Sequence, residues 1–138
     1  MTPAFVMDAS IAMAWCFVDE STETTDQLKV GLEHASALVP SHWFLETANA
    51  LAMAERRQRI DAADSDAFVG MLESLNLEIY DDLKRTYSIV LPLARTYRLT
   101  VYDAAYLDLA RQRRLPLASL DLDLRGAAMS LGIEVLGM

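Results

Sequence analysis

The sequence predicts an α/β fold in which a central, mostly parallel sheet of about five short strands carries helices on both faces. Short apolar runs of strand length recur along the chain, and longer helix-forming segments separate them. Strands joined in this way pair in parallel through helical crossovers. With 138 residues, 53% of them hydrophobic, the chain suffices for one well-filled core, so we expect a single domain over residues 1–138.

The first strand is predicted over residues 4–7, an apolar run that ends at Asp8. A short helix over residues 10–17 follows it. Residues 21–35 bring their leucines to one side of a helix, which indicates an amphipathic helix. The apolar residues 37–39 lie directly before a proline and predict the second strand.

Residues 42–59 predict a long helix that contains Glu46. Its apolar residues are spread around most of the helix circumference, so we expect much of this helix to be buried. Another helix is predicted over residues 61–75, and the run at 77–80 is predicted to be the third strand.

A further helix is predicted over residues 82–98. Pro92 lies inside it and is expected to kink or split it, because proline lacks the backbone N–H that an α-helix needs. The next helix starts close to Asp103, which is followed by alanine and leucine residues that favour a helix. A carboxylate at this position meets unpaired N–H groups, so a role as N-cap or first-turn residue would by itself explain Asp103.

The last two strands are predicted over residues 116–120 and 133–136. The first of them ends at Asp121, and a short helix continues to about residue 131. Gly132 is expected to stop that helix.

The charge of the chain limits its partners. There are 20 acidic and 12 basic residues, a formal net charge of -8, which argues against a general phosphate-binding surface. A metal ion held by some of the acids would add positive charge where a phosphate approaches. Basic residues cluster at 56–59 and 111–114, and either solvated helix ends or RNA contacts would explain them.

No apolar run approaches the roughly 18 residues that a membrane span needs. The N-terminus also lacks the basic region of a signal peptide. We therefore expect a cytoplasmic protein without membrane contact. The single cysteine, Cys16, has no partner for a disulfide or a zinc site and is expected in the core.

Four acids each lie beside an apolar run that must be buried: Asp8, Glu46, Asp103 and Asp121. In a parallel sheet, ligands bind beyond the carboxyl ends of the strands, and the first and last of these acids follow predicted strands. We expect the other two to reach the same edge from neighbouring helices, so that one pocket holds all four. Negative charges this close repel one another, so we expect a cation to lie among the four carboxylates.

Carboxylate oxygens suit Mg²⁺, with Mn²⁺ as the alternative. The two histidines, His34 and His42, lie outside the acidic segments, so a zinc site is not expected. Each acid also has a plain structural explanation, as a turn residue, a surface acid or a helix cap. Asp123 competes with Asp121, but Asp121 directly follows the strand and is the preferred ligand.

Four segments resemble, in order and approximate spacing, the signature segments of PIN-domain proteins of the VapC toxin type: residues 6–10, 45–51, 100–107 and 116–121. The resemblance covers nearly the whole chain. It implies a metal-dependent endoribonuclease of a type II toxin–antitoxin module, with the four acids as catalytic and metal-binding residues. It also implies supporting polar residues, for which the candidates are Ser10, Asn49, Ser119 and Asp123.

By the same resemblance, the partners are an RNA substrate, a cognate VapB-type antitoxin and a second copy of the chain in a homodimer. The chain departs from the family pattern at Ser119, where threonine is commoner. Leu120 and Leu122 stand where smaller or polar residues are frequent. These larger side chains would narrow the entrance to the acidic site, and all four acids that would bind the metal are still present. Most of the aromatic residues Trp15, Phe17, Trp43 and Phe44 are expected in the core, and the remainder would line a dimer seam or an antitoxin groove.

Two other classes of function compete with this one. A PIN-like module that has lost its chemistry would serve as a binding scaffold, and metal-dependent cleavage separates it from a nuclease. A receiver-type or phosphoryl-transfer domain also gathers aspartates at a sheet edge, but it usually needs a lysine from a late loop. The only lysines here are Lys29 and Lys84.

Overall fold

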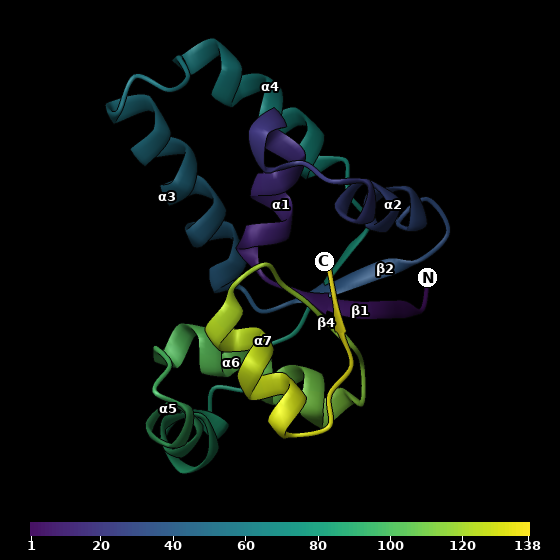
Figure 1. Ribbon diagram of the computed structural model, residues 1–138, viewed down its shortest axis with the longest axis vertical. Coiled ribbons are helices and arrows are strands. Elements are labelled where there is room, and N and C mark those ends of the chain that lie inside the picture. Colours follow the sequence, from purple (N-terminus) through teal and green to yellow (C-terminus); the bar gives the residue numbers. More distant parts are fainter.

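Five parallel strands form one sheet at the centre of the computed structural model, which describes residues 1–138. Their order across the sheet is β3-β2-β1-β4-β5, and the three labelled strands β2, β1 and β4 lie side by side in Figure 1. The strands are β1 (Pro3–Met7), β2 (Ser36–Val39), β3 (Leu77–Ile79), β4 (Leu117–Ala118) and β5 (Val135–Leu136). Every pair of neighbours is parallel, so the predicted α/β fold with a sheet of about five strands is confirmed.

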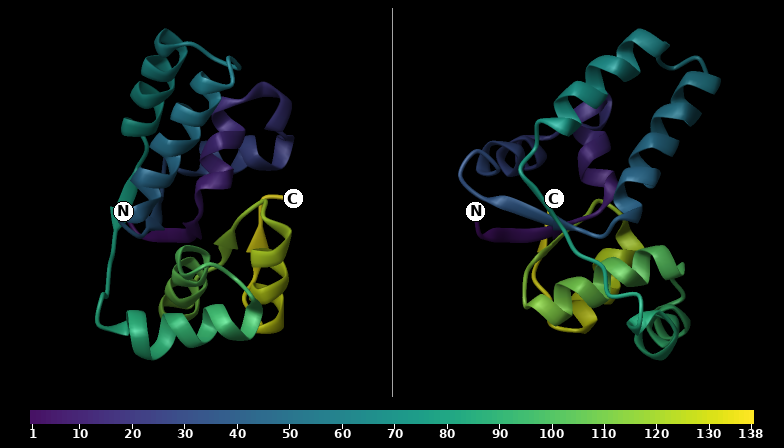
Figure 2. Two further views of the ribbon diagram at one scale, coloured as in Figure 1. Left: turned by 90° about the vertical axis from the view of Figure 1, so that its left-hand side faces the viewer. Right: turned by 180° about the vertical axis from the view of Figure 1, so that it is seen from behind.

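Helices cover both faces of this sheet, as predicted. The elements α1 to α4 lie on one side, and α5 to α7 lie on the other (Figure 2). The first group is α1 (Ala9–Cys16), α2 (Glu23–Gly31), α3 (His42–Arg56) and α4 (Ala62–Glu73). The second group is α5 (Leu91–Tyr97), α6 (Val101–Arg113) and α7 (Leu122–Ser130). No helix is long and apolar enough to cross a membrane.

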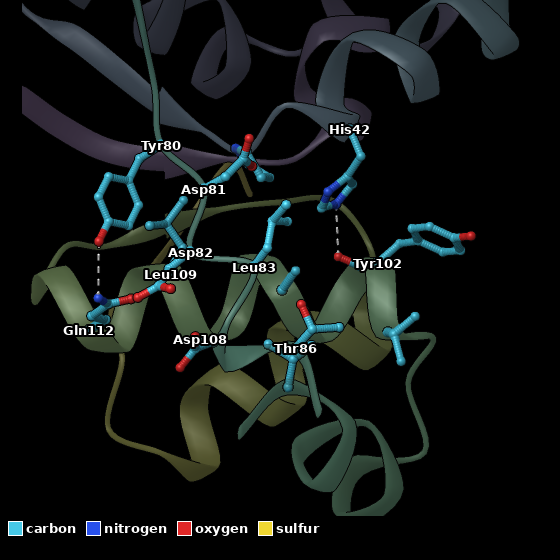
Figure 3. Close-up of a pocket in the computed structure, with 14 residues that line it drawn as sticks. His42, Tyr80, Asp81, Asp82, Leu83, Thr86, Tyr102, Asp108, Leu109 and Gln112 are labelled. Atoms are coloured by element: carbon cyan, nitrogen blue, oxygen red, sulfur yellow. Dashed lines mark hydrogen bonds between the residues drawn. The ribbon is translucent and has the colours of Figure 1, made fainter. Parts of the chain in front are cut away.

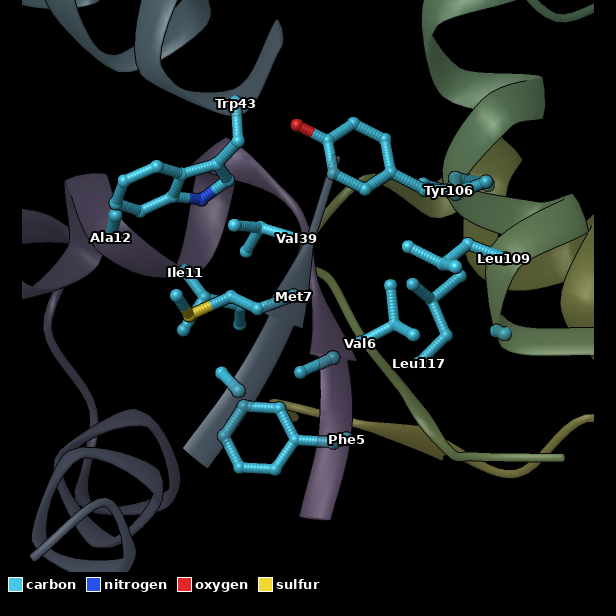
Figure 4. Close-up of a cluster of buried hydrophobic side chains, with 14 of the residues drawn as sticks. Phe5, Val6, Met7, Ile11, Ala12, Val39, Trp43, Tyr106, Leu109 and Leu117 are labelled. Atoms are coloured by element: carbon cyan, nitrogen blue, oxygen red, sulfur yellow. The ribbon is translucent and has the colours of Figure 1, made fainter. Parts of the chain in front are cut away.

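The central strand β1 is buried on both faces. Val6 pairs with Leu38 of β2 on one side and with Leu117 of β4 on the other, and all three are fully buried. Trp43 from α3 approaches β1 from one face, and Tyr106 from α6 approaches it from the other (Figure 4). Burial of large side chains on both faces fixes the layers, because each buried aromatic removes a large apolar area from water.

Capping side chains fix the starts of several helices. The helix predicted over residues 21–35 is shorter, because Thr22 is its N-cap and forms a reciprocal capping box with Thr25. In the same way, Asp61 caps α4 in a capping box with Asp64. Leu32, predicted on the buried side, lies just past the end of α2 and is buried.

The prediction that α3 is buried around most of its circumference is wrong. Only one side is covered, and the side chains of Phe44 and Leu45 are 41% and 75% exposed. The reason is that α3 and α4 form a hairpin that extends away from the sheet (Figure 1), so that α1 and α4 cover a single face of α3. The helix also ends at Arg56 and not at residue 59.

The helix predicted over residues 82–98 changes from a π-helical to an α-helical hydrogen-bond pattern just before Pro92 and is not interrupted there. A π-helical turn over Thr86–Val90 precedes α5, and the N–H of Leu91 bonds to the carbonyl of Thr86. A π turn shifts the hydrogen-bond pattern by one residue at the point where the proline can donate nothing. The last two strands are also shorter than predicted, with only two residues each.

Candidate active site

The carboxyl ends of β1 and β4 form the topological switch point of the sheet. The chain leaves β1 for α1 on one face of the sheet, and it leaves β4 for α7 on the opposite face (Figures 1 and 2). Adjacent loops therefore diverge at this point, which is where parallel sheets bind ligands. Asp8 directly follows β1, and Asp121 lies three residues after the end of β4.

Asp8 is held by donors from both diverging loops. As the N-cap of α1, its Oδ1 accepts hydrogen bonds from the backbone N–H of Ser10 at 3.0 Å and from the Ser10 hydroxyl at 2.5 Å. Its Oδ2 accepts a hydrogen bond from the hydroxyl of Ser119 at 2.5 Å. The carboxylate of a residue that is 5% exposed is thereby fixed in one orientation.

The two serines also join the loops to each other. The Ser10 hydroxyl accepts the backbone N–H of Leu120 at 2.8 Å, and the Ser119 hydroxyl accepts the backbone N–H of Asp121 at 3.0 Å. Ser10 and Ser119, two of the polar residues expected to support the acids, therefore lie beside Asp8 and link it to the start of the segment that carries Asp121.

Burial raises the pKa of Asp8 to about 6. Loss of hydration disfavours the charged carboxylate, and the negative charge of Asp103 acts in the same direction. The hydrogen bonds from Ser10 and Ser119 oppose this shift. A carboxyl group that titrates this close to neutrality is unusual outside functional sites.

Asp103 lies in the first turn of α6, one of its two predicted positions. The N-cap is Thr100, whose hydroxyl accepts the backbone N–H of Asp103 at 3.1 Å. Partial burial raises the pKa of Asp103, and the charges of Asp121 and Glu46 raise it further. The charges of all three other predicted acids thus interact with Asp103, since its own charge acts on Asp8.

Glu46 reaches the same edge from α3, where Tyr106 of α6 holds it. The Tyr106 hydroxyl donates a hydrogen bond of 2.6 Å to Oε1 of Glu46. Tyr106 is fully buried, and its pKa lies well above the ordinary value because of burial and the adjacent carboxylate. Nε2 of His42, one turn before Glu46, lies 3.5 Å from the same Oε1.

Sequence reasoning did not assign a role to Tyr106 or His42. Both carry a local signal: Tyr106 lies three residues after Asp103 and His42 four residues before Glu46, so each shares a helix face with an acid. The structure adds the long-range contact between the two helices. His42 is also 3.1 Å from the backbone carbonyl of Tyr102.

Asp121 is the exposed N-cap of α7. Its Oδ1 accepts the backbone N–H groups of Asp123 and Leu124 at 2.9 and 3.1 Å. Asp123 contributes this N–H, and its exposed side chain makes no hydrogen bond or ion pair. Asn49 is exposed on α3, one turn after Glu46, and lies outside the hydrogen-bonded network.

Comparison with known proteins identifies the fold family. The chain matches the PIN domain family over residues 5–128. It belongs to the PIN domain family. The solved structure of PAE2754 from Pyrobaculum aerophilum is similar to this PIN domain with a TM-score of 0.71 and 24% sequence identity, over 92% of this chain and 87% of that one. No curated protein sequence matches the chain significantly.

Membership supports a nuclease-like fold, because PIN domains are generally metal-dependent nucleases. In this PIN domain, no three histidine, cysteine, aspartate or glutamate side chains come close enough together to surround one ion. The donor chemistry nevertheless suits a hard cation such as Mg²⁺. Oδ2 of Asp121 and Oε2 of Glu46 accept no hydrogen bond within the chain, so each of these two carboxylates keeps one oxygen free.

The basic clusters of this PIN domain lie at helix ends away from the acids. Arg59, just past α3, forms ion pairs with Asp19 at 2.6 Å and Glu20 at 3.2 Å. Arg111 lies at the end of α6, eight residues after Asp103, which is about 12 Å along a helix. These contacts agree with the interpretation of the clusters as solvated helix ends.

Proposed function

We propose that this PIN domain is a metal-dependent endoribonuclease and the toxin of a type II toxin–antitoxin module of the VapC type. The observation that carries the proposal is electrostatic. Carboxylates from three other segments of the chain interact with Asp103 at the switch point of the sheet: burial raises the pKa of Asp103 and of Asp8, and repulsion from the neighbouring acids raises both further. Proteins rarely keep such mutual repulsion unless a cation relieves it.

In this proposal Asp8, Glu46, Asp103 and Asp121 hold Mg²⁺, or Mn²⁺ in its place. When bound, such an ion supplies an activated water and offsets negative charge on the phosphate during hydrolysis of the RNA backbone. The residues of the chain fix the ligands: Ser10 and Ser119 orient Asp8, and Tyr106 orients Glu46. The backbone N–H of Asp123 orients Asp121, and Asn49 remains an exposed polar group available to RNA.

An antitoxin segment would bind in the groove between α3 and α4. A cavity of about 160 Å³ opens there, with a lining that is mostly apolar and includes Phe44, Leu51 and Val69. The exposed apolar residues of α3 suit the apolar face of a helix, and the chain's net charge of -8 favours a basic partner. We propose that the protein acts in the cytoplasm, as a homodimer when free of antitoxin.

These partners can be tested by co-expression. The small protein encoded directly upstream is expected to co-purify with this chain. The double substitution Phe44→Ser with Val69→Ser should prevent this co-purification. It should leave the fold unchanged, because both residues are at least 39% exposed. Isolation of a stable, inactive chain with no partner would count against the antitoxin. A monomeric mass in light scattering would count against the homodimer.

The nuclease itself is tested on a mixed pool of cellular RNA with Mg²⁺, with Mn²⁺ and with chelator. Cleavage is expected with either metal and not with chelator, and it should be lost in Asp8→Asn and in Asp103→Asn. Asp66→Asn is the matched control, because Asp66 is an exposed aspartate of α4 without side-chain contacts. Cleavage that survives both substitutions would show that the acidic site is wrong.

A second candidate function is a binding module without catalysis. It is favoured by the finding that no three acidic side chains surround a common point. The same experiment separates the two, because absence of cleavage with either metal favours the binding module or a very narrow choice of RNA.

A further inference from the structure

His42 connects α3 to α6 across the acidic edge. It is the first residue of α3, and its ring lies against the first turn of α6, which belongs to the helical layer on the other side of the sheet. Figure 3 shows the ring reaching from α3 to the backbone of Tyr102, at the wall of a cavity of about 240 Å³. One side chain therefore bridges the two layers beside the acids.

Aromatic contacts hold this ring in one orientation. The ring centroids of His42 and Tyr106 are 5.0 Å apart, with an angle of 70° between the planes. Those of His42 and Tyr102 are 5.8 Å apart, with an angle of 63°. Aromatic pairs favour such edge-to-face geometry. Because Tyr106 is fully buried and the side chain of His42 is only 22% exposed, the imidazole has little freedom to turn.

The surroundings of Nε2 assign its hydrogen. Nε2 of His42 lies 3.1 Å from the backbone carbonyl oxygen of Tyr102 and 3.5 Å from Oε1 of Glu46. Carbonyl and carboxylate oxygens accept hydrogen bonds and have no hydrogen to donate. Nε2 therefore carries a hydrogen and donates it to the Tyr102 carbonyl. A nitrogen in this state lacks the free lone pair that binds a metal ion.

A second hydrogen bond runs in the opposite direction between the same helices. The Tyr106 hydroxyl of α6 donates to Oε1 of Glu46 on α3 at 2.6 Å, whereas His42 of α3 donates to the carbonyl of Tyr102 on α6. His42 and Glu46 are four residues apart on one helix, and Tyr102 and Tyr106 are four residues apart on the other. Each pair thus shares a helix face, and the two pairs form a reciprocal clamp between α3 and α6.

The clamp acts on two of the four acids. Asp103 directly follows Tyr102 in the first turn of α6, so the bond from His42 holds the turn that carries this acid. The bond from Tyr106 holds Glu46 itself. Mg²⁺ requires ligand oxygens at about 2.0–2.1 Å in near-ideal octahedral geometry. Two carboxylates from different helices can bind one such ion only if the separation of the helices is kept.

We propose that His42 is a positioning residue of the acidic site. Its Nε2–H holds the first turn of α6 against α3 and thereby sets the separation of Asp103 from Glu46. His42 does not coordinate the ion, although its imidazole lies beside Glu46. This role in metal binding rests on the proposed function. Loss of a partner that orients metal ligands typically lowers metal affinity 10–100-fold, so the clamp has a measurable effect on binding.

The first test is Mn²⁺ binding to the full chain without RNA, measured by electron paramagnetic resonance of the free ion. His42→Phe keeps an aromatic ring and removes the donor, and it is expected to weaken binding about tenfold. His42→Gln places an amide N–H near the position of Nε2 and should restore most of the lost affinity. His34→Phe is the matched control at the other, exposed histidine and should bind Mn²⁺ like the wild type.

The second test is nitrogen-15 NMR of the His42 ring in the wild type, which needs no substitution. In chelator, Nε2 is expected to carry a hydrogen, and addition of Mg²⁺ should leave that hydrogen in place. A ring with its hydrogen on Nδ1 alone would overturn the proposal. Loss of the hydrogen from Nε2 when Mg²⁺ is added would also overturn it, because His42 would then be a ligand.

The Mn²⁺ titrations have two outcomes that contradict the clamp. Unchanged affinity in His42→Phe would show that the donor is not needed, and an equal loss in His42→Phe and His42→Gln would indicate direct coordination by the imidazole. Absence of Mn²⁺ binding in the wild type would instead refute the metal site of the proposed function. In that case the NMR measurement in chelator alone decides, and a hydrogen on Nε2 supports the clamp between α3 and α6.

Discussion

The hydroxyl of Tyr106 donates a hydrogen bond of 2.6 Å to Oε1 of Glu46, across 60 positions of sequence. This bond joins the two helical layers at the acidic edge, because Tyr106 belongs to α6 and Glu46 to α3. Glu46 is about one-third exposed, so the buried tyrosine restricts a side chain that would otherwise be free to rotate.

Tyr106→Phe is expected to lower metal-dependent RNA cleavage about tenfold, because it removes the bond that orients Glu46 and keeps the buried ring. A hydrogen bond to a charged group contributes roughly 1.5–3 kcal/mol. The fold should persist, since water can hydrate the released carboxylate. The measurement is the cleavage rate against Mg²⁺ concentration, and the concentration for half-maximal rate should rise. Tyr97→Phe, a half-buried tyrosine without a hydrogen bond, is the control.

The raised pKa of Asp8 predicts a specific pH dependence of stability. In the folded chain Asp8 has a pKa of about 6, above its ordinary value of 3.8. The folded state therefore binds the proton more tightly, so this carboxyl favours folding most below pH 3.8 and progressively less as the pH rises to about 6. The full shift corresponds to about 3 kcal/mol.

Asp8→Asn is neutral at every pH and should lack this dependence. Between pH 5 and pH 7.5, in chelator, the variant is expected to gain roughly 1 kcal/mol over the wild type in free energy of unfolding. Urea titrations at both pH values measure this difference. A constant difference between wild type and variant would show that Asp8 is already ionised at pH 5.

The order of strands and helices was predictable because it depends on local patterns. Short apolar runs, a proline inside a helix and a glycine after a helix are all readable along the chain, and the sheet formed as predicted. The exposure of Leu45 was not predictable. It depends on the direction in which α3 leaves the sheet, and the same apolar residues would be buried if another element covered that side.

The candidate site likewise has features that local sequence patterns predict and features that depend on distant contacts. Asp8 and Asp121 were expected at the switch point because each follows a strand, and the structure has them there. The contacts of Ser119 with Asp8 and of Tyr106 with Glu46 join residues 111 and 60 positions apart. Such pairs leave no local pattern, so the sequence indicates the candidate acids and not the side chains that hold them.

Metal binding is expected to stabilise the wild type in a pH-dependent way. An ion that binds only the folded state adds about 2.7 kcal/mol at 100 times its dissociation constant, so Mg²⁺ should raise Tm at pH 7.5. At pH 5 only about a tenth of Asp8 is ionised if its pKa is about 6, and apparent affinity should fall about tenfold because ligands must be deprotonated. Thermal melts at both pH values measure this. An equal increase of Tm in Asp103→Asn would show that the ion binds elsewhere.

Arg125 fixes the turn that carries Ser119. Its Nη1 donates hydrogen bonds to the carbonyl oxygens of Ser119 at 2.8 Å and Leu136 at 2.9 Å, so one side chain of α7 joins the ends of β4 and β5. Ser119 is fully buried, and its carbonyl has little access to water once the guanidinium is removed. An unpaired buried carbonyl costs about 1–3 kcal/mol.

Arg125→Leu is therefore expected to lower the free energy of unfolding by about 2 kcal/mol, which lowers Tm by roughly 4–10 °C for a domain of this size. Arg95→Leu, at an exposed arginine of α5 without side-chain contacts, should change Tm little. Because Ser119 orients Asp8, the Arg125 variant should also lose cleavage activity at temperatures where it remains folded. Full activity in a destabilised Arg125→Leu would mean that Ser119 keeps its position without this support.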